Sequence, residues 1–416
     1  ERFSFYGMRG ILVPFMTTQL LARDGSLATM PESEATGWFH LFVWAVYITP
    51  LFGAMVADYA WGKYRTIVSL SVVYCLGHLA LALDATRLGL FLGLALISLG
   101  SGGIKGCVSA HVGDQFGAAN SGLLPRVYIW FYFSINLGSC LAFLIVPKLL
   151  EVRGPHWGFG IGGIAMFIAT VAFWMGRFRY AHIPPRGREF VKEVFSKEGL
   201  RVLGRLSLVY ACVAIFWSLF DQTSSRWIKQ AEKMDLDPFE LGWQLNPAQY
   251  QFLNPLLVML FIPACALFIY PWINRVFPLS PLRKMAIGFF LAIPSFLIPA
   301  WLEMRIEAGE APSILWQWLA YVFITMAEVM ISITGLEFSY TQAPPKMKSL
   351  MLGYWYFAVS MGNLFTSMVN FFIADRLPGV TYYLFFSACI AVTALAFIFI
   401  ARGYRARTYL QDEAQV

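Results

Sequence analysis

The chain has 416 residues, of which 58% are hydrophobic and 13% are charged, whereas soluble domains carry about 25% charged residues. This composition indicates a membrane protein, and at about 20 apolar residues per span there is room for about a dozen helices. A transmembrane β-barrel is excluded, because its strands would alternate polar and apolar residues and these segments do not. The net charge of +7 does not indicate a nucleic-acid partner, because the cations lie in loops beside apolar segments, where they act as topology signals.

Cysteine and histidine give no sign of a metal or redox centre. The six cysteines lie singly in apolar segments without CxxC spacing, which is typical of small buried side chains. The five histidines are also scattered singly. An intramembrane enzyme, which would need a metal cluster or a nucleophile–base pair, is therefore disfavoured.

Hydrophobic runs separated by turn and charge signals predict twelve transmembrane helices. Their expected cores are residues 3–22, 36–57, 65–83, 88–110, 124–147, 158–178, 203–227, 248–272, 284–302, 313–336, 350–373 and 380–401. The chain opens inside the first run, so we expect it to be truncated at its N-terminus.

Loop charges predict the orientation. When the loops are assigned alternately to the two sides, nineteen Lys and Arg residues fall on one side and nine on the other. The side with more Lys and Arg includes the C-terminus and is expected to be cytoplasmic. With twelve spans, the N-terminus is expected on the same side.

A long basic linker divides the chain into two halves. We expect a six-helix bundle over residues 1–178, a cytoplasmic linker over 179–202, a second six-helix bundle over 203–401 and a cytoplasmic tail over 402–416. The fold class is therefore an all-α membrane protein. This layout resembles the major facilitator superfamily, whose halves rock around a midplane site, and residues 53–65 resemble that superfamily's short loop signature.

The buried cations all come from the first half. Arg2, Tyr6 and Arg9 stand at i, i+4 and i+7 and share one face of the first helix. The two arginines either snorkel to the headgroups or line a polar cavity, where a guanidinium could bind a carboxylate bidentately. Lys105 follows a glycine-rich stretch and lies too far from either helix end to snorkel easily, so we expect it to face a cavity.

Other polar residues of the first half accompany these cations. His40 and Tyr47 are seven residues apart and share a face. His40 is either an interfacial or structural residue or a proton sensor, since imidazole changes charge near neutral pH. Asn136 is an uncharged donor and acceptor in apolar surroundings.

The buried anions come from the second half. Asp221 lies one turn from Trp217, and Glu328 lies seven residues after Tyr321 on the same face. A lone charge at the bilayer centre costs about 2.5–3.5 kcal/mol on insertion scales, so each acid requires a partner or a substrate.

Three further residues of this half are candidates. Asn254, before a proline, offers an amide, and Trp355 offers either an aromatic wall or packing. Glu337 is expected to be structural or gating near the cytoplasm. Because cations come from one half and anions from the other, a zwitterion would satisfy both halves at once, and a peptide is the commonest extended zwitterion.

These residues closely resemble the proton-coupled oligopeptide transporter (POT) family. The matching motifs occur in the family's order along nearly the whole chain. They are Glu1–Gly7 (ERFSFYG), Gly103–Lys105 (GIK), Phe131–Gly138 (FYFSINLG), Phe216–Trp217 and Glu337–Pro344 (EFSYTQAP).

The resemblance implies a role for each candidate. Arg2 and Lys105, with Tyr6 and Tyr47, would hold the peptide carboxylate. Glu328, with Asn136 and Asn254, would hold the amino terminus, beside Trp217, Tyr321 and Trp355. Arg9 and Asp221 would form the outer gate, and Glu1, His40, Glu328 and Glu337 would serve proton coupling and gating.

The sequence also departs from the family pattern. The family's first glutamate would lie before Glu1, Phe5 replaces a tyrosine and removes one hydroxyl from the pocket, and Gly106 replaces a proline. The linker is too short for two extra helices, and residues 303–312 lack the large extracellular domain of animal members. A bacterial inner-membrane protein is therefore expected.

The resulting hypothesis is a proton-coupled symporter of di- and tripeptides that works by alternating access, as a monomer in membrane lipid. Its only co-substrate is the proton gradient, and no other cofactor is expected. Without peptide, Lys105 would pair with Glu328 and Arg9 with Asp221. The alternative is a transporter of the same fold that moves nitrate or another organic anion.

Overall fold

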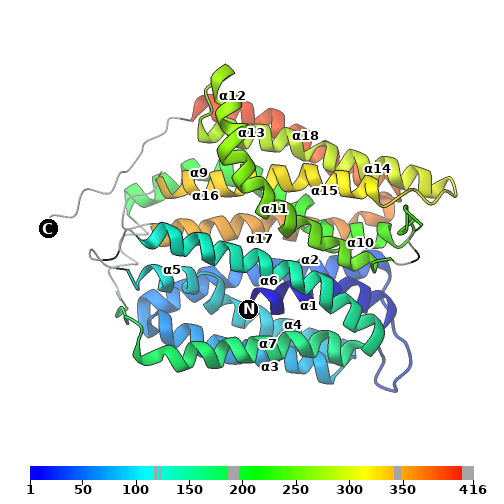
Figure 1. Cartoon of the computed structure of the whole chain (residues 1–416), viewed down its shortest axis with the longest axis horizontal. Coiled ribbons are helices and arrows are strands. Elements are labelled where there is room, and N and C mark those ends of the chain that lie inside the picture. Colours follow the sequence, from blue (N-terminus) through cyan, green and yellow to red (C-terminus); the bar gives the residue numbers. More distant parts are fainter. Residues whose placement is uncertain are drawn as a thin grey trace.

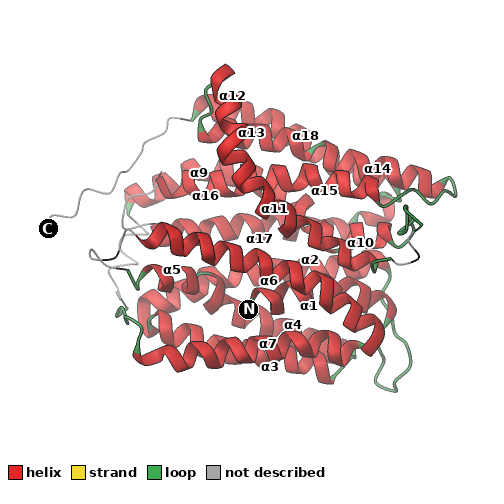
Figure 2. Cartoon of the chain, in the orientation of Figure 1, coloured by secondary structure: helices red, strands yellow, loops and turns green. Residues whose placement is uncertain are grey.

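The protein is an assembly of helices. The computed structural model describes residues 1–116, 120, 123–185, 196–240, 242, 244–341 and 348–404, and over these residues it contains helices, turns and no strand (Figure 2). The all-α class predicted from composition is confirmed.

The first half contributes six long helical segments, several of them broken into consecutive pieces. They are α1 (Arg2–Thr18), α2 (Glu32–Val56) with η1 (Ala57–Trp61), α3 (Lys63–Leu83), α4 (Arg87–Lys105) with α5 (Cys107–Gly113), α6 (Leu124–Arg153), and α7 (Pro155–Met175) with η3 (Gly176–Phe178).

The second half repeats this pattern. Its segments are α9 (Lys197–Phe220) with η4 (Asp221–Ser224) and α10 (Arg226–Ala231); η5 (Pro247–Phe252), α11 (Leu253–Ala264), η6 (Cys265–Ile269) and α12 (Tyr270–Val276); α13 (Pro281–Ala292) with α14 (Pro294–Glu307); α15 (Leu315–Glu328), η7 (Val329–Ile333) and α16 (Thr334–Thr341); α17 (Lys348–Phe372) with η9 (Ala374–Arg376); and α18 (Val380–Gly403).

Ten of these segments are long and apolar enough to cross a membrane. The 17-residue α1 and the 25-residue α17 are not among these ten but pack against them, and with these two the described residues contain the twelve predicted crossings. The helix that opens the second half begins at Lys197, inside the predicted linker, and α18 runs into the predicted tail as far as Gly403. Most of the tail and the middle of the linker lie outside the described residues.

The two halves lie side by side, with α2 and α17 packed together between them (Figure 1). A second contact between the halves joins α6 to α11 and η5, and α1 also reaches η4 and η5. The predicted charges lie on α1, α4, η4 and α15. Of these, α1 and α4 pack against α2, η4 contacts α1, and α15 packs against α11, so all four adjoin the contacts between the halves.

Glycines allow the helices of each half to approach closely. A Cβ on Gly53 of α2 would lie 2.0 Å from the carbonyl oxygen of Gly102 on α4, and one on Gly362 of α17 would lie 2.1 Å from the carbonyl oxygen of Ala214 on α9. Only residues without a side chain permit such contact between membrane helices. The contact at Gly102 places the next turn, which carries Lys105, directly beside α2.

Three of the buried charges lie where a helix is interrupted. Lys105 is the last residue of α4, which stops before Gly106 and resumes as α5. Asp221 opens the 3₁₀ segment η4, and Glu328 is the last residue of α15 before the π-helical turn η7. Such interruptions expose backbone groups and often mark functional sites in membrane helices.

Candidate functional site: charged residues between the two halves

The cations of the first half gather at the start of α1. The Arg2 Nε lies 3.2 Å from a carboxylate oxygen of Glu1, and the Arg2 side chain is 21% exposed. Lys105 is only 3% exposed, and its Nζ lies 3.6 Å from the ring centroid of Phe5 and 5.2 Å from that of Tyr47. The ammonium therefore rests on aromatic faces, an attraction worth up to about 2 kcal/mol when desolvated.

Lys105 and Glu1 each keep an unsatisfied atom. The Nζ of Lys105 and the second carboxylate oxygen of Glu1 are buried and make no hydrogen bond to described residues. The two side chains are near enough for their charges to interact. The cluster therefore has one donor and one acceptor without a partner. A bound ligand could hydrogen-bond to them, or a small side-chain rotation could bring them together.

The acid of the second half faces the same region. The Asn254 Nδ2 donates to Glu328 Oε2 at 2.8 Å and to Thr325 Oγ1 at 3.1 Å, and Glu328 is partly exposed. Tyr6 is near enough to Arg2, Arg9 and Glu328 for their charges to act on it. Tyr6 also contacts Phe143 edge-on, with ring centroids 5.8 Å apart.

A buried ion pair joins the halves above this region. Arg9 donates to Asp221, and their side chains are 3% and 0% exposed. The second oxygen of Asp221 accepts from Asn363 Nδ2 on α17 at 2.6 Å. The predicted pair of Arg9 and Asp221 is therefore present, and α17 completes it.

His40 extends this network. Its Nδ1 lies 2.7 Å from Asn363 Oδ1 and its Nε2 lies 3.1 Å from Ser225 Oγ, and the ring is fully buried. Asn363 presents its amide nitrogen to Asp221 and Val359, so its oxygen accepts and Nδ1 of His40 carries the hydrogen. His40 is therefore hydrogen-bonded at both nitrogens, and its role in proton coupling stays a prediction.

Further polar contacts close the same end of the bundle, which carries α10 and the connection between α1 and α2. We call this the outer end. Arg226 donates to Glu32 at 2.8 Å and to Asn370 at 2.9 Å. Lys229 donates to Thr17 at 3.3 Å, and Gln251 donates to the carbonyl of Gly10 at 3.2 Å. Each contact except that with Asn370 joins one half to the other, so these contacts hold the two halves together at this end.

Two aromatic candidates lie in the packing core. Tyr321 is 2% exposed and packs edge-on against Trp227, with ring centroids 4.9 Å apart. Trp355 is 3% exposed and packs against Tyr210 and over Gly335. These positions match packing, which was the alternative reading of Trp355. Their role in binding stays a prediction.

The remaining candidates belong neither to the charged cluster nor to the fully buried packing core. Asn136 donates to the carbonyl of Tyr132 in its own helix at 3.0 Å, so its amide nitrogen is already bonded. Trp217 is half-buried, and its indole nitrogen has no hydrogen-bond partner among the described residues. Glu337 lies on α16, near Tyr270, and the QAP end of its motif lies outside the described residues.

One detail of the sequence hypothesis needs correction. The predicted pair of Lys105 and Glu328 is not formed, because Lys105 lies against Phe5 and Tyr47 and Glu328 is held by Asn254. Phe5 is fully buried, and its ring face supports the ammonium. That its missing hydroxyl removes a group from the pocket stays a prediction.

Sequence reasoning missed the residues that connect the charges. Asn363, Ser225, Thr325 and Tyr356 are polar residues in or beside apolar helices; Tyr356 stands next to Tyr47, with ring centroids 5.9 Å apart. Asn363 follows the buried acid by more than a hundred positions, and no spacing rule relates them. Only the unusual position of an amide within α17 could have singled it out. The described residues contain no group of three or more His, Cys, Asp or Glu side chains placed to hold a metal ion.

Comparison with known proteins gives a consistent result. The family model described as PTR2, POT family, matches residues 64–198 and 194–378. The chain is 35% identical over 354 residues to "Peptide transporter family 1" of Drosophila melanogaster, covering 74% of this chain and 46% of that protein. It is 34% identical over 391 residues to "Solute carrier family 15 member 2" of Homo sapiens, covering 81% and 52%. The chain thus spans about half the length of these curated relatives.

Solved structures agree over nearly the whole chain. A crystal structure of an auto-inhibited POT family peptide transporter superposes with a TM-score of 0.88 at 34% identity, covering 99% of this chain and 96% of that one. The structure of the POT family transporter PepTSo gives a TM-score of 0.87 at 34% identity, covering 97% and 95%. The predicted major facilitator fold is confirmed.

The buried ion pair makes a first prediction about stability. Asp221→Asn leaves the Arg9 guanidinium buried without its counter-ion and should lower stability by about 3–5 kcal/mol. The double variant Arg9→Gln with Asp221→Asn should lose less, because no unpaired charge remains. Thermal unfolding of the purified protein, followed by tryptophan fluorescence, measures both.

A matched control is the exposed pair of Arg305 and Glu310, where Glu310→Gln should cost about 0–1 kcal/mol. The role of the buried pair is contradicted if Asp221→Asn unfolds at the temperature of the unchanged protein. It is also contradicted if the double variant is less stable than Asp221→Asn alone.

Proposed function

This chain belongs to the POT family, and from that premise we propose that it is a proton-coupled symporter of di- and tripeptides that works by alternating access. The observation that carries the proposal is the separation of charge: an ammonium without a hydrogen-bonded anion in one half, and a partly exposed carboxylate in the other. A peptide carries the complement of both.

The charge balance of the site supports a zwitterion. Three cations (Arg2, Arg9 and Lys105) and three acids (Glu1, Asp221 and Glu328) come together between the halves. When all six are ionised their charges cancel. A zwitterion leaves this balance unchanged, whereas nitrate or another anion adds a charge that only a proton taken up with it would compensate in a region of low dielectric.

The contacts support one orientation of the peptide. The peptide carboxylate would displace Glu1 from Arg2 and supply the anion that Lys105 lacks. The peptide ammonium would approach Glu328, whose other oxygen accepts from Asn254. Side-chain selectivity should be weak, because the termini of the peptide supply the orienting charges.

Protonation would change which partners are free. A proton on Glu1 removes the anion that holds Arg2, so that Arg2 can join Lys105 in binding the peptide carboxylate. Inward movement of the proton is favourable by about 2.3 kcal/mol per 100 mV of membrane potential, and this free energy would drive accumulation of the peptide.

His40 can take part because its surroundings accept either protonation state. When it is neutral, Nε2 accepts from the Ser225 hydroxyl. When it is charged, Nε2–H donates to Ser225 Oγ, and the hydroxyl hydrogen turns to the carbonyl of Gln222, 3.4 Å away. A proton on His40 adds one positive charge to the network that joins the halves at the outer end, which would shift the balance of the gate.

The chain crosses the membrane many times, and we place it in the plasma membrane with both termini in the cytoplasm. The count of loop cations supports this orientation. Residues 308–314 join α14 to α15 directly, which supports a bacterial inner-membrane protein over an animal one. The contacts at the outer end would then close the protein toward the outside. A single copy of the chain would transport both the peptide and the proton.

Uptake by proteoliposomes tests the substrate. With an inward proton gradient they should accumulate labelled dialanine, and N-acetyl-dialanine and dialanine amide should each compete roughly tenfold or more weakly, because each loses a charge-assisted interaction. Glu328→Gln should abolish the discrimination against the acetylated peptide only, and Lys105→Gln that against the amide only, as measured by inhibition constants.

Glu337→Gln serves as the matched control and should keep both discriminations. The peptide-holding arrangement is wrong if the Glu328 and Lys105 variants also keep both. Accumulation of nitrate without accumulation of dialanine would support the anion transporter instead.

The hydroxyl of Ser225 gives a separate prediction for proton coupling. Ser225→Ala removes the partner of Nε2 in both protonation states and should reduce proton-driven accumulation severalfold, while peptide counterflow at equal pH stays near normal. Ser225→Thr, which restores a hydroxyl, should recover accumulation. An equal loss in the two assays would show that Ser225 supports the fold and not the coupling.

A further inference from the structure

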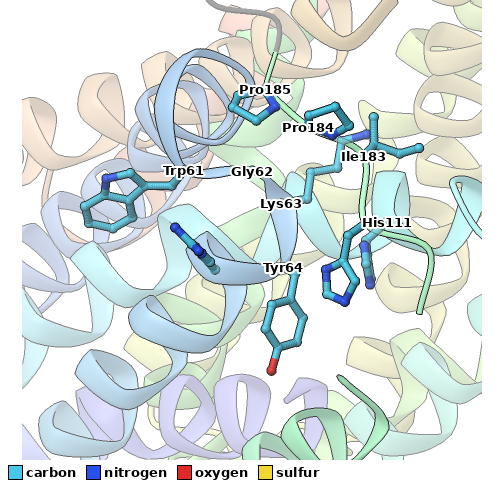
Figure 3. Close-up of a pocket in the computed structure, with 10 residues that line it drawn as sticks. Trp61, Gly62, Lys63, Tyr64, His111, Ile183, Pro184 and Pro185 are labelled. Carbon is cyan, nitrogen blue, oxygen red and sulfur yellow. The ribbon is translucent and has the colours of Figure 1, made fainter. Parts of the chain in front are cut away.

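A pocket with basic and aromatic walls (Figure 3) lies beside α5, at the end of the first half opposite to the end that carries α10 (Figure 1). Its volume is about 450 Å³, within the range of about 300–1,000 Å³ of small-molecule sites. The walls come from the start of α3, from α5 and from the connection after η3. None of the residues assigned above to peptide or proton lines it.

The first turn of α3 forms one wall. Gly62 turns the chain into the helix with φ +75°, and Gly62, Lys63, Tyr64 and Arg65 all line the pocket. This 21-residue helix has no acidic residue in its first turn and no side-chain cap. The first N–H groups of any helix have no partner within the helix, and those of Lys63 to Arg65 stand at the cavity with the positive end of the helix dipole.

The charges around the pocket favour an anion. Lys63 already pairs with Asp114 at 2.7 Å. Arg65 forms no ion pair with the part of the chain that the structure describes, and no carboxylate lines the pocket there. The uncompensated charge at the pocket is therefore that of the Arg65 guanidinium, and a guanidinium matches phosphate geometry.

His111 on α5 provides an independent sign of a ligand. The residue is 4% exposed, its side chain lines the pocket, and its Nε2 is buried without a hydrogen-bond partner among the described residues. Its ring is fixed edge-on against Phe173 and Tyr180, with centroids 5.5 and 5.3 Å apart. A buried polar atom of this kind calls for a partner, and an anion in the pocket would supply it.

The remaining wall is held in place before any ligand binds. The side chain of Gln115 bonds Ala181 at both its N–H (2.8 Å) and its carbonyl (3.3 Å), which ties α5 to the connection after η3. The ring of His182 then packs edge-on against Tyr64, with centroids 4.8 Å apart. This wall is thus held in place by the protein itself.

We propose that this pocket binds a phosphate group, held by the N-terminus of α3, by Arg65 and by His111 Nε2–H. The group could belong to inorganic phosphate or to the headgroup of an anionic phospholipid at the membrane surface. Trp61, which also lines the pocket and is 50% exposed, suits an interfacial position. The proposal does not depend on what the transporter carries.

The test uses the full chain in nanodiscs of phosphatidylcholine. Inorganic phosphate is titrated by calorimetry, and in a second arm phosphatidylglycerol is added and retained lipid is counted by native mass spectrometry. Arg65→Gln should weaken binding about tenfold, as expected for the loss of one charged hydrogen bond, and His111→Phe should also weaken it. Arg126→Gln, an exposed arginine at the start of α6, is the matched control and should bind normally.

Saturable binding of inorganic phosphate that Arg65→Gln weakens identifies a site for free phosphate. Retention of phosphatidylglycerol without binding of inorganic phosphate, again lost in Arg65→Gln, identifies a headgroup site. The proposal is overturned if neither ligand binds saturably, or if Arg126→Gln weakens binding as much as Arg65→Gln. Because Arg65 is exposed, its variant tests the site even if the His111 variant does not fold.

Discussion

The buried ion pair between Arg9 and Asp221 is the interaction on which the rest of the site depends. Removing two charges from water costs several kcal/mol per ion, so the pair depends on further hydrogen bonds to the carboxylate. Asn363 from α17 donates to the second oxygen of Asp221 and accepts from His40, which is hydrogen-bonded in turn to Ser225. Segments from both halves therefore meet at one network, and they separate only if its charges find other partners.

The same constraint explains the arrangement around the proposed peptide site. Each half keeps charges that it cannot neutralise alone, and they stand where a helix stops or changes its winding. Lys105 lies against Phe5 and Tyr47 in place of an anion. These rings stabilise its charge but leave the ammonium without a hydrogen-bond acceptor. A ligand carboxylate or a rearranged Glu1 supplies that acceptor, and this makes the site sensitive both to peptide and to protonation.

Much of this could be predicted from the sequence. Twelve spans follow from hydropathy because lipid demands long apolar helices, and a charge deep within a span, such as Glu328 or Lys105, stands out by its cost. The pairing of Arg9 with Asp221 followed from the resemblance. The predicted pair of Lys105 and Glu328 is absent, because aromatic faces stabilise the ammonium in place of an anion. Helical periodicity does not reveal whether a buried cation lies against an anion or against an aromatic ring. Asn363 and Ser225 gave no signal, since single polar residues in helices are common and their partners lie far away in the chain.

The central claim is that the two halves hold opposite ends of one zwitterion. A structure of the protein with bound dialanine tests it most directly. The account predicts the peptide carboxylate within hydrogen-bonding distance of Arg2 or Lys105 and the ammonium within hydrogen-bonding distance of Glu328. A peptide bound in the reverse orientation, or bound without contact to Glu328, would contradict it.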